Sequence, residues 1–257
     1  MTATGLTDVE LARQIADTAG RLLIDLRTSG LFAGKALGKS GDQIANAFIM
    51  QALRLNRPDD AILSEEEKDN ALRLAAQRVW IVDPLDGTRE YGEARADWAV
   101  HVALAVDGVA TLGAVALPGL PLTLSSAETP ARPRHHGRLR MVVSRTRPAA
   151  EAVAVAEALG AELIPMGSAG AKAMAVVRGE ADIYLHSGGQ YEWDSCAPVA
   201  VAQAAGLHVS RMDGSVLRYN CADSYLPDLL VCPKEYAVRV IELAARHGAG
   251  VAPGAAS

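Results

Sequence analysis

Two aspartates stand three residues apart in the segment WIVDPLDGTRE, residues 80–90, directly after a short apolar run. Carboxylates such as Asp83 and Asp86 are hard oxygen donors of the kind that Mg²⁺ prefers, and the carbonyl of Leu85 between them could add a further ligand. Pro84 stiffens the turn that carries these groups. The spacing therefore predicts a divalent metal site at this point of the chain.

The two residues that follow suit a phosphate group. Gly87 lets the backbone approach a phosphate closely, and a helix that starts at Gly87 and Thr88 would offer free amide groups together with the Thr88 hydroxyl. Metal and phosphate would then share one site. The segment Asp-Pro-Leu-Asp-Gly is also typical of a plain β-turn, and taken alone it favours that simpler interpretation.

Further acids occupy similar positions elsewhere. Glu65 follows a short apolar run, and Asp194 follows Trp193 where a helix is expected to begin. Taken singly, the glutamates at 65–67 are typical of a solvated first helical turn, and Asp194 and Asp42 are each typical of helix N-caps. Acids that gather at the ends of strands are costly unless a cation binds them. Together they therefore support a metal site.

Helices and strands must position these side chains, and apolar spacing predicts several of them in the first half. They are a helix that starts at a capping box of Thr7 and Glu10, a helix from about Asp42 to the break at 56–58, an apolar run at 61–63, a strand at 79–82 that stops at Asp83, and a hairpin of strands 98–106 and 111–117 around Asp107 and Gly108. This half is expected to be helices that cover an antiparallel or mixed sheet.

The stretch SSAETPARPRHHG, residues 125–137, has no apolar period, and we place a domain junction there. Beyond it, strands and helices alternate, as in an α/β protein. The predicted elements are strands 139–143, 162–164, 183–185 and 229–231, and helices 148–159, one ending at Gly179, and one of small residues after Asp194. The predicted divisions are an α+β metal- and phosphate-binding half at 1–130, an α/β substrate-specificity half at 138–248 and a disordered tail at 249–257.

Composition excludes several classes of protein. The formal net charge is -5, so there is no overall basic field to hold a polynucleotide, although a bound cation could still attract a small anion. No leader pattern and no run of eighteen apolar residues occur, which predicts neither export nor a membrane partner. The three cysteines form neither a paired disulfide pattern nor a zinc pattern, which favours the cytoplasm.

Three motifs resemble the signatures of the inositol monophosphatase superfamily, in matching order and spacing: SEE at 64–66, DPLDGT at 83–88 and WDSCAP at 193–198. The second half is similar to bisphosphate nucleotidases of the CysQ type through VVSRTRP at 142–148, GSAGAK at 167–172 and DGSVLRYN at 213–220. The resemblance extends over roughly residues 7–245. One departure is Ser64, where many relatives have glycine.

The resemblance implies a layered αβαβα sandwich of the α+β / α/β class, a Mg²⁺-dependent phosphatase activity and inhibition by lithium. It implies that two or three Mg²⁺ ions are bound by Glu65, Asp83, the Leu85 carbonyl, Asp86 and Asp194. Asp42 and Thr88 would orient the attacking water, and Glu65 is the third catalytic residue that the resemblance implies. The scissile phosphate would contact Glu65, Leu85, Asp86, Gly87, Thr88 and Asp194.

The leaving group depends on the second half. Ser144, Arg145, Ser168 and Lys172 follow strands or start helices, where they could meet a second phosphate; alternatively, Arg145 lies in a solvated loop and Lys172 on a helix surface. By resemblance the substrate is 3'-phosphoadenosine 5'-phosphate or its sulfated form, which links the protein to sulfate assimilation.

Alternatives are an inositol monophosphatase, a fructose-1,6-bisphosphatase or a nucleotide-binding sensor without turnover. None of His101, His135 and His136 is expected to act as a general base, and Cys196 is expected to be a buried thiol. A homodimer is compatible with the sequence.

Overall fold

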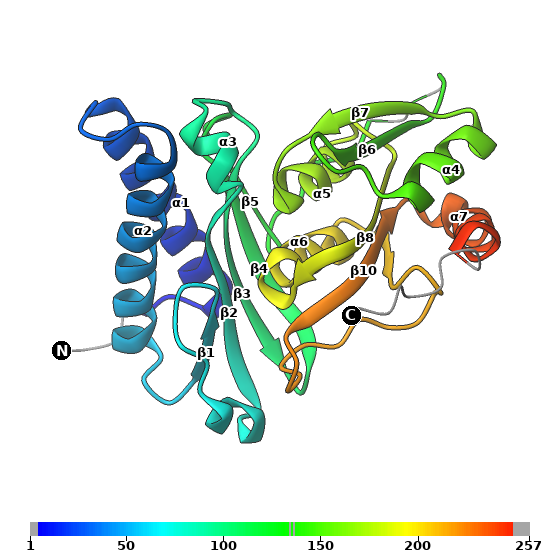
Figure 1. Cartoon of the computed structure of the whole chain (residues 1–257). Helices are drawn as coiled ribbons and strands as arrows, with labels where there is room; N and C mark the ends of the chain where they lie inside the picture. The colour runs from blue at the N-terminus through cyan, green and yellow to red at the C-terminus, as the bar shows by residue number, and fades with distance from the viewer. Residues whose placement is uncertain (1–4, 134, 136, 249–257) are drawn as a thin grey trace, which may run out of the picture.

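The computed structural model describes residues 5–133, 135 and 137–248, which form five alternating layers of helices and sheets (Figure 1). The outer layer on one side is α1 (Asp8–Thr28) and α2 (Gly34–Asn56), followed by the first sheet. The middle layer is α5 (Ala169–Val177) and α6 (Glu192–Ala204). The second sheet and then α4 (Ala150–Leu159) and α7 (Lys234–Gly248) complete the stack. The predicted αβαβα order is confirmed.

The two sheets are both mixed. The first has the order β1-β2-β3-β4-β5, in which only β1 and β2 run parallel: β1 (Ala61–Ser64), β2 (Arg78–Asp86), β3 (Ala99–Val106), β4 (Val109–Leu117) and β5 (Leu122–Ser125). The second has the order β7-β6-β8-β10-β9: β6 (Arg140–Ser144), β7 (Glu162–Met166), β8 (Ile183–Tyr191), β9 (His208–Ser210) and β10 (Tyr225–Cys232). Here β6 runs parallel to β7 and β8, and the other pairs are antiparallel.

Strand β2 is buried on both faces, as its β-branched and aromatic residues predict. Trp80 and Val82 pack with α1 and α2, whereas Val79 and Ile81 belong to a cluster that includes α5 and α6. This second cluster draws residues from both halves of the chain. The middle layer of helices therefore packs against β2 and the second sheet together.

The second helix begins at Gly34, so the prediction that it starts near Asp42 is wrong, as is the N-cap interpretation of Asp42. The glycine-rich segment 34–41 is helical because α3 (Thr88–Gly92) packs very closely against it. A Cβ atom at Gly38 would lie 2.6 Å from Thr88 Cγ2. Gly38 and Gly41, of a residue type that weakens a helix, therefore lie on the face of α2 that contacts α3.

Strand β2 also continues past Asp83, contrary to the prediction that it stops there. The pairing with β3 shifts register between Asp83, opposite His101, and Asp86, opposite Ala99. Pro84 lies within this irregularity and cannot donate a ladder hydrogen bond. The bulge allows β2 to continue to Asp86 and places Asp83 and Asp86 close together.

Other predicted elements agree closely with the structure. The Thr7 capping box and the Asp107–Gly108 turn are confirmed, the latter with φ angles of 52° and 74°. The helix considered at Gly87 and Thr88 is α3, whereas the sequence did not predict β5, β9, α7 or the 3₁₀ helix at Ala71–Ala75. No helix among the described residues is both long and apolar enough to cross a membrane. The predicted tail at 249–257 lies outside the described residues.

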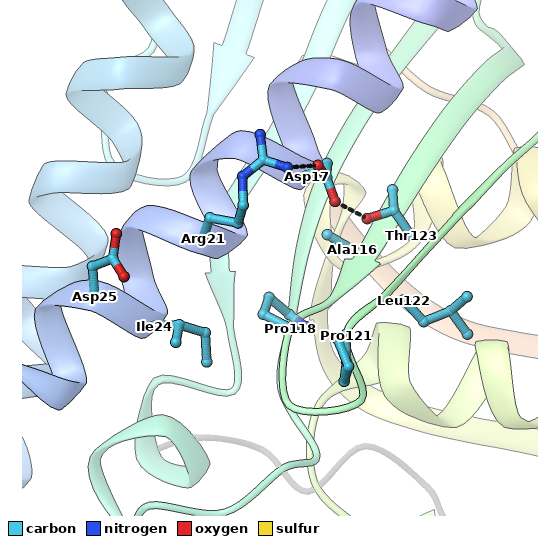
Figure 2. A pocket seen from close by; sticks show the side chains of 9 residues that line it. All are labelled: Asp17, Arg21, Ile24, Asp25, Ala116, Pro118, Pro121, Leu122 and Thr123. Carbon is cyan, nitrogen blue, oxygen red and sulfur yellow. Dashed lines mark hydrogen bonds and ion pairs between the residues drawn. The ribbon is translucent and has the colours of Figure 1, made fainter.

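A hollow of about 510 Å³ between α1 and the β4–β5 turn contains none of the predicted site residues (Figure 2). Asp17 on α1 accepts hydrogen bonds there from Arg21 and Thr123. Close by, a Cβ atom at Gly20 would lie 2.6 Å from Pro118 Cγ. Helix α1 therefore packs against this turn as tightly as α2 packs against α3.

Candidate active site

Three aspartates from two distant segments converge between the first sheet and the middle helices. Asp83 and Asp86 lie on β2, and Asp194 lies in the first turn of α6, where it accepts a hydrogen bond from the Tyr191 amide at 2.7 Å. One carboxylate oxygen from each lies within 4.8 Å of the others. Three acids this close repel one another unless protons or a cation intervene.

Asp83 is the most deeply buried of the three. Its side chain is 1% exposed, and its Oδ1 accepts a hydrogen bond from the Leu85 amide at 3.0 Å. Burial, and then the charges of Glu65, Asp86 and Asp194, raise its pKa well above the ordinary value. Burial and the charge of Asp86 likewise raise the pKa of Asp194 to about 7.

Asp86 has the opposite environment because it lies against the N-terminus of α5. It accepts hydrogen bonds from Ser168 Oγ at 2.5 Å, the Gly170 amide at 2.6 Å and the Ala169 amide at 3.1 Å. His101 Nε2 lies 3.3 Å from the same carboxylate. Burial alone would raise the pKa of Asp86, but His101 and these donors lower it to about 2.

Asp42 and Thr88 lie together beside the three aspartates, on α2 and α3. Thr88 Oγ1 is 3.1 Å from Asp42 Oδ2 and 3.1 Å from the Leu85 carbonyl oxygen. Asp42 is buried, and its Oδ1 has no hydrogen-bond partner among the described residues. Burial and the charge of Glu66 raise the pKa of Asp42 to about 7.

Glu65 directly follows β1, as predicted. The residue is exposed, but its carboxyl group faces the other acids, and partial burial followed by the charge of Asp42 raises its pKa to about 7. A hydrogen bond with Asp83 opposes this rise, so the two carboxyl groups are near enough to share a proton. Glu65 therefore borders the trio without belonging to it.

The acids fit a hard divalent cation. Asp83, Asp86 and Asp194 converge, Asp42 carries an unpartnered buried oxygen, and the raised pKa values of four acids show that their negative charge lacks compensation within the protein. Oxygen donors of this type suit Mg²⁺. The site can therefore hold a divalent metal ion.

Gly87 has a φ angle of 90°, in the left-handed region that favours glycine, and it is the N-cap of α3. A Cβ atom there would lie 3.2 Å from the Cβ atoms of Ser168 and Trp98. The first turn of α3 thus fits tightly against the N-terminus of α5. The phosphate cradle predicted for Gly87 and Thr88 stays a prediction.

Lys172 is 4% exposed, so the alternative that placed it on a helix surface is wrong. Its ammonium group donates to the carbonyl oxygens of Ser168 at 2.6 Å and Gly167 at 3.1 Å, and lies over the Tyr184 ring. Burial lowers the pKa of Lys172. Lys172 therefore supports the turn before α5, from which Ser168 reaches Asp86.

Ser144 ends β6 and Arg145 follows it, and among the described residues neither contacts the converging aspartates. Ser144 Oγ accepts a hydrogen bond from the Arg147 amide at 3.2 Å. Arg145 is not the solvated residue of the alternative interpretation, because its guanidinium pairs with Glu90 at 2.9 Å and Glu93 at 2.8 Å. Both acids flank the end of α3, so Arg145 ties the second half to this helix.

His101 was not predicted to take part in the site, yet it is fully buried against Asp86. Its Nδ1 lies 3.0 Å from the Trp193 carbonyl oxygen, beside Asp194. Burial would lower its pKa, but Asp86 outweighs this and raises it. The sequence feature that could have indicated this role is the presence of His101 within the otherwise apolar strand β3.

Comparison with known proteins agrees with this geometry. The profile of the Inositol monophosphatase family matches residues 36–249. The 3'-phosphoadenosine 5'-phosphate phosphatase of Mycobacterium leprae (strain TN) is 49% identical over 247 residues, which cover 90% of this chain and 91% of that protein. The 3'(2'),5'-bisphosphate nucleotidase CysQ of Escherichia coli (strain K12) is 33% identical, covering 73% of this chain and 81% of that protein.

Solved structures share the fold. CysQ from Bacteroides thetaiotaomicron superposes with a TM-score of 0.75 at 25% identity, covering 88% of this chain and 97% of that one. The inositol monophosphatase from Anabaena (Nostoc) sp. PCC 7120 has a TM-score of 0.74 at 19% identity, covering 93% and 95%. The resemblance predicted from the motifs is confirmed, and the chain belongs to the inositol monophosphatase family.

Proposed function

We propose that this chain hydrolyses 3'-phosphoadenosine 5'-phosphate, and also its sulfated form, releasing AMP and inorganic phosphate from the former, with Mg²⁺ as cofactor. The observation that carries the proposal is the 49% identity, over 90% of the chain, to the M. leprae phosphatase of that substrate. The converging acids are the chemical counterpart of this similarity, because they can hold the cations that a phosphate ester requires.

Two or three Mg²⁺ ions would be held by Glu65, Asp83, the Leu85 carbonyl, Asp86 and Asp194. Bound Mg²⁺ would neutralise charge on the phosphate oxygens and lower the pKa of the attacking water.

Thr88 and Asp42 would orient the attacking water. The Thr88 hydroxyl has one hydrogen, and the Asp42 carboxylate 3.1 Å away is a stronger acceptor than the Leu85 carbonyl. Donation to Asp42 leaves the Thr88 oxygen free to accept a hydrogen bond from water. Asp42 thus fixes the direction of the hydroxyl, and Thr88 fixes the position of the water.

The nucleoside would lie on the side of the second half. Ser168 is near enough, since it bonds Asp86, whereas Lys172 and Arg145 already have partners within the protein. A role for Ser144, Arg145, Ser168 and Lys172 in binding the second phosphate remains a proposal.

A phosphate-release assay with Mg²⁺ tests the proposal. The panel contains 3'-phosphoadenosine 5'-phosphate, inositol 1-phosphate and fructose 1,6-bisphosphate, and we expect the highest kcat/KM for the nucleotide. A preference for inositol or fructose phosphates would overturn the substrate assignment. Tight nucleotide binding without phosphate release would instead indicate a sensor. Millimolar lithium in the same assay checks the inhibition expected from the resemblance.

A cytoplasmic location, a link to sulfate assimilation and a homodimer belong to the same proposal. All three cysteines are free, with Cys196 and Cys232 buried and Cys221 exposed, which is compatible with a reducing compartment. Cell fractionation and size-exclusion chromatography with light scattering would test the location and the oligomeric state.

A further inference from the structure

A cavity of about 800 Å³ opens beside Asp42 and Thr88, between the start of α2 and helix α3. Three cationic side chains line it, Lys35 and Lys39 from α2 and Arg89 from α3. All three are exposed, and among the described residues none makes an ion pair or a side-chain hydrogen bond. The proposed function gives these cations no role.

The acids in this cavity compensate the cations only in part. Glu93 is already paired with Arg145 at 2.8 Å, and Asp42 bonds Thr88. Glu66 is the remaining acid in the lining, and neither it nor Asp42 has a cationic partner among the described residues. Three cations therefore face two acids without a cationic partner, and this excess of positive charge favours a small anion.

The position of the cavity indicates which anion enters it. In an in-line displacement, the attacking water and the leaving group lie on opposite sides of phosphorus. Asp42 and Thr88 are on the side of the water in the proposed mechanism, and they line this cavity. The nucleoside therefore leaves in the other direction, away from Lys35, Lys39 and Arg89.

The products follow from the bonds that change. A bond forms between the water oxygen and phosphorus, and the bond between phosphorus and the ribose oxygen breaks. The electron pair of the broken bond stays on the ribose oxygen, which takes up a proton, and the water gives up a proton. The phosphorus centre inverts and moves toward the side from which the water came.

We infer that this cavity receives the released inorganic phosphate, held by Lys35, Lys39 and Arg89 before it reaches solvent. The inference rests on the proposed in-line hydrolysis. Lysine acts as a point charge and arginine as a two-pronged donor, and both bind the strong acceptor oxygens of phosphate. Phosphate would move from the acid-lined site into a cation-lined exit.

The test compares product inhibition by inorganic phosphate and by AMP in Lys39→Met, Arg89→Met and the double variant. Because the side chains are exposed, we expect each single change to raise the Ki for phosphate about two- to fivefold, and the double change about tenfold. The KM for the nucleotide and the Ki for AMP should change less than about twofold. Lys234→Met, which removes an exposed lysine at the start of α7, is the charge-matched control and should leave all constants unchanged.

Two outcomes would overturn the inference. One is an unchanged Ki for phosphate in the double variant. The other is a rise in the KM for the nucleotide and in the Ki for AMP that equals or exceeds the rise in the Ki for phosphate. The second result would mean that the cations bind the 5'-phosphate of the nucleotide.

Failure of the proposed function would be visible separately. If the protein does not act on the nucleotide, the Ki for phosphate is measured with whichever ester of the panel it hydrolyses. Calorimetric titration of inorganic phosphate into the Mg²⁺-loaded wild-type and double-variant proteins gives the same comparison without turnover. Weaker phosphate binding in the double variant supports the inference, and equal binding contradicts it.

Discussion

The close packing of α2 against α3 predicts that Gly38→Ala damages catalysis without altering any acid. The new Cβ atom would lie 2.6 Å from Thr88 Cγ2 and 3.1 Å from the Thr88 carbonyl oxygen. Carbon atoms in contact are separated by about 3.5–4.0 Å, so one side must move by about 1 Å. Rotation of Thr88 would swing its hydroxyl away from Asp42, and movement of α3 would displace the whole residue.

A misplacement of about 1 Å can lower the rate about 100-fold, so we expect kcat to fall about 10- to 100-fold. Stability should change much less. Alanine is favoured over glycine inside a helix by about 1 kcal/mol, and overpacking costs about 1–3 kcal/mol. We therefore expect the free energy of unfolding to fall by about 0–2 kcal/mol in denaturant titrations.

Gly20→Ala is the matched control, because its Cβ atom would lie 2.6 Å from Pro118 Cγ, and Pro118 lines a hollow that contains none of the acids of the site (Figure 2). It should lose similar stability and keep wild-type kcat. Thr88→Ser removes Cγ2 but keeps the hydroxyl, so adding it to Gly38→Ala should restore about tenfold of the lost activity. The reasoning is refuted if Gly38→Ala stays within twofold of Gly20→Ala, or if the double variant recovers nothing.

Three further predictions concern the charged groups of the site. Asp83→Asn should leave no more than a few per cent of phosphate release and abolish the rise in melting temperature with Mg²⁺, whereas Asn at the exposed Asp59 should change neither. In metal-free protein, Asp42, Glu65 and Asp194 have pKa values of about 7 in the folded state, above their ordinary values near 4. Between pH 4 and pH 7 the folded state therefore binds more protons than the unfolded state. The melting temperature of the metal-free protein should consequently fall from pH 5 to pH 8. Added Mg²⁺ should reverse that fall, and a metal-free melting temperature that rises over this range would contradict the assignment. Arg145→Met should lower the free energy of unfolding because it leaves buried Glu90 unpaired; a tenfold rise in the KM for the nucleotide, absent in Arg147→Met, would show that Arg145 also binds substrate.

The acids of the site could be predicted because Asp and Glu are identified directly in the sequence and stand at the ends of strands or the start of a helix. Asp83 and Asp86 follow an apolar strand, Glu65 follows another, and Asp194 stands in the first turn of a helix. The layered fold could be predicted from the motifs, but the start of α2 could not. Glycine is unfavourable inside a helix, so Gly38 did not indicate one in the sequence. The structure shows that the missing side chain permits the close contact between α2 and α3.

The groups that face Asp86 could not be read from the sequence in the same way. Two of its hydrogen-bond donors are backbone amides, of Ala169 and Gly170, and every residue except proline carries such a donor. The indirect signal is the small size of the residues in GSAGAK. A Cβ atom at Gly170 would collide with the His101 ring, so glycine there permits α5 to approach Asp86 and His101 together.

That approach gives the motif a structural role in addition to the proposed binding of the second phosphate. Ser168 donates to Asp86, and Lys172 holds the carbonyl oxygens of the preceding turn, so both residues fix a carboxylate of the first sheet to a helix of the second half. Asp194 comes from α6 in the same middle layer. Because this layer is also the core that the two sheets share, substitutions that loosen it should disturb the converging aspartates and the packing of both halves at once.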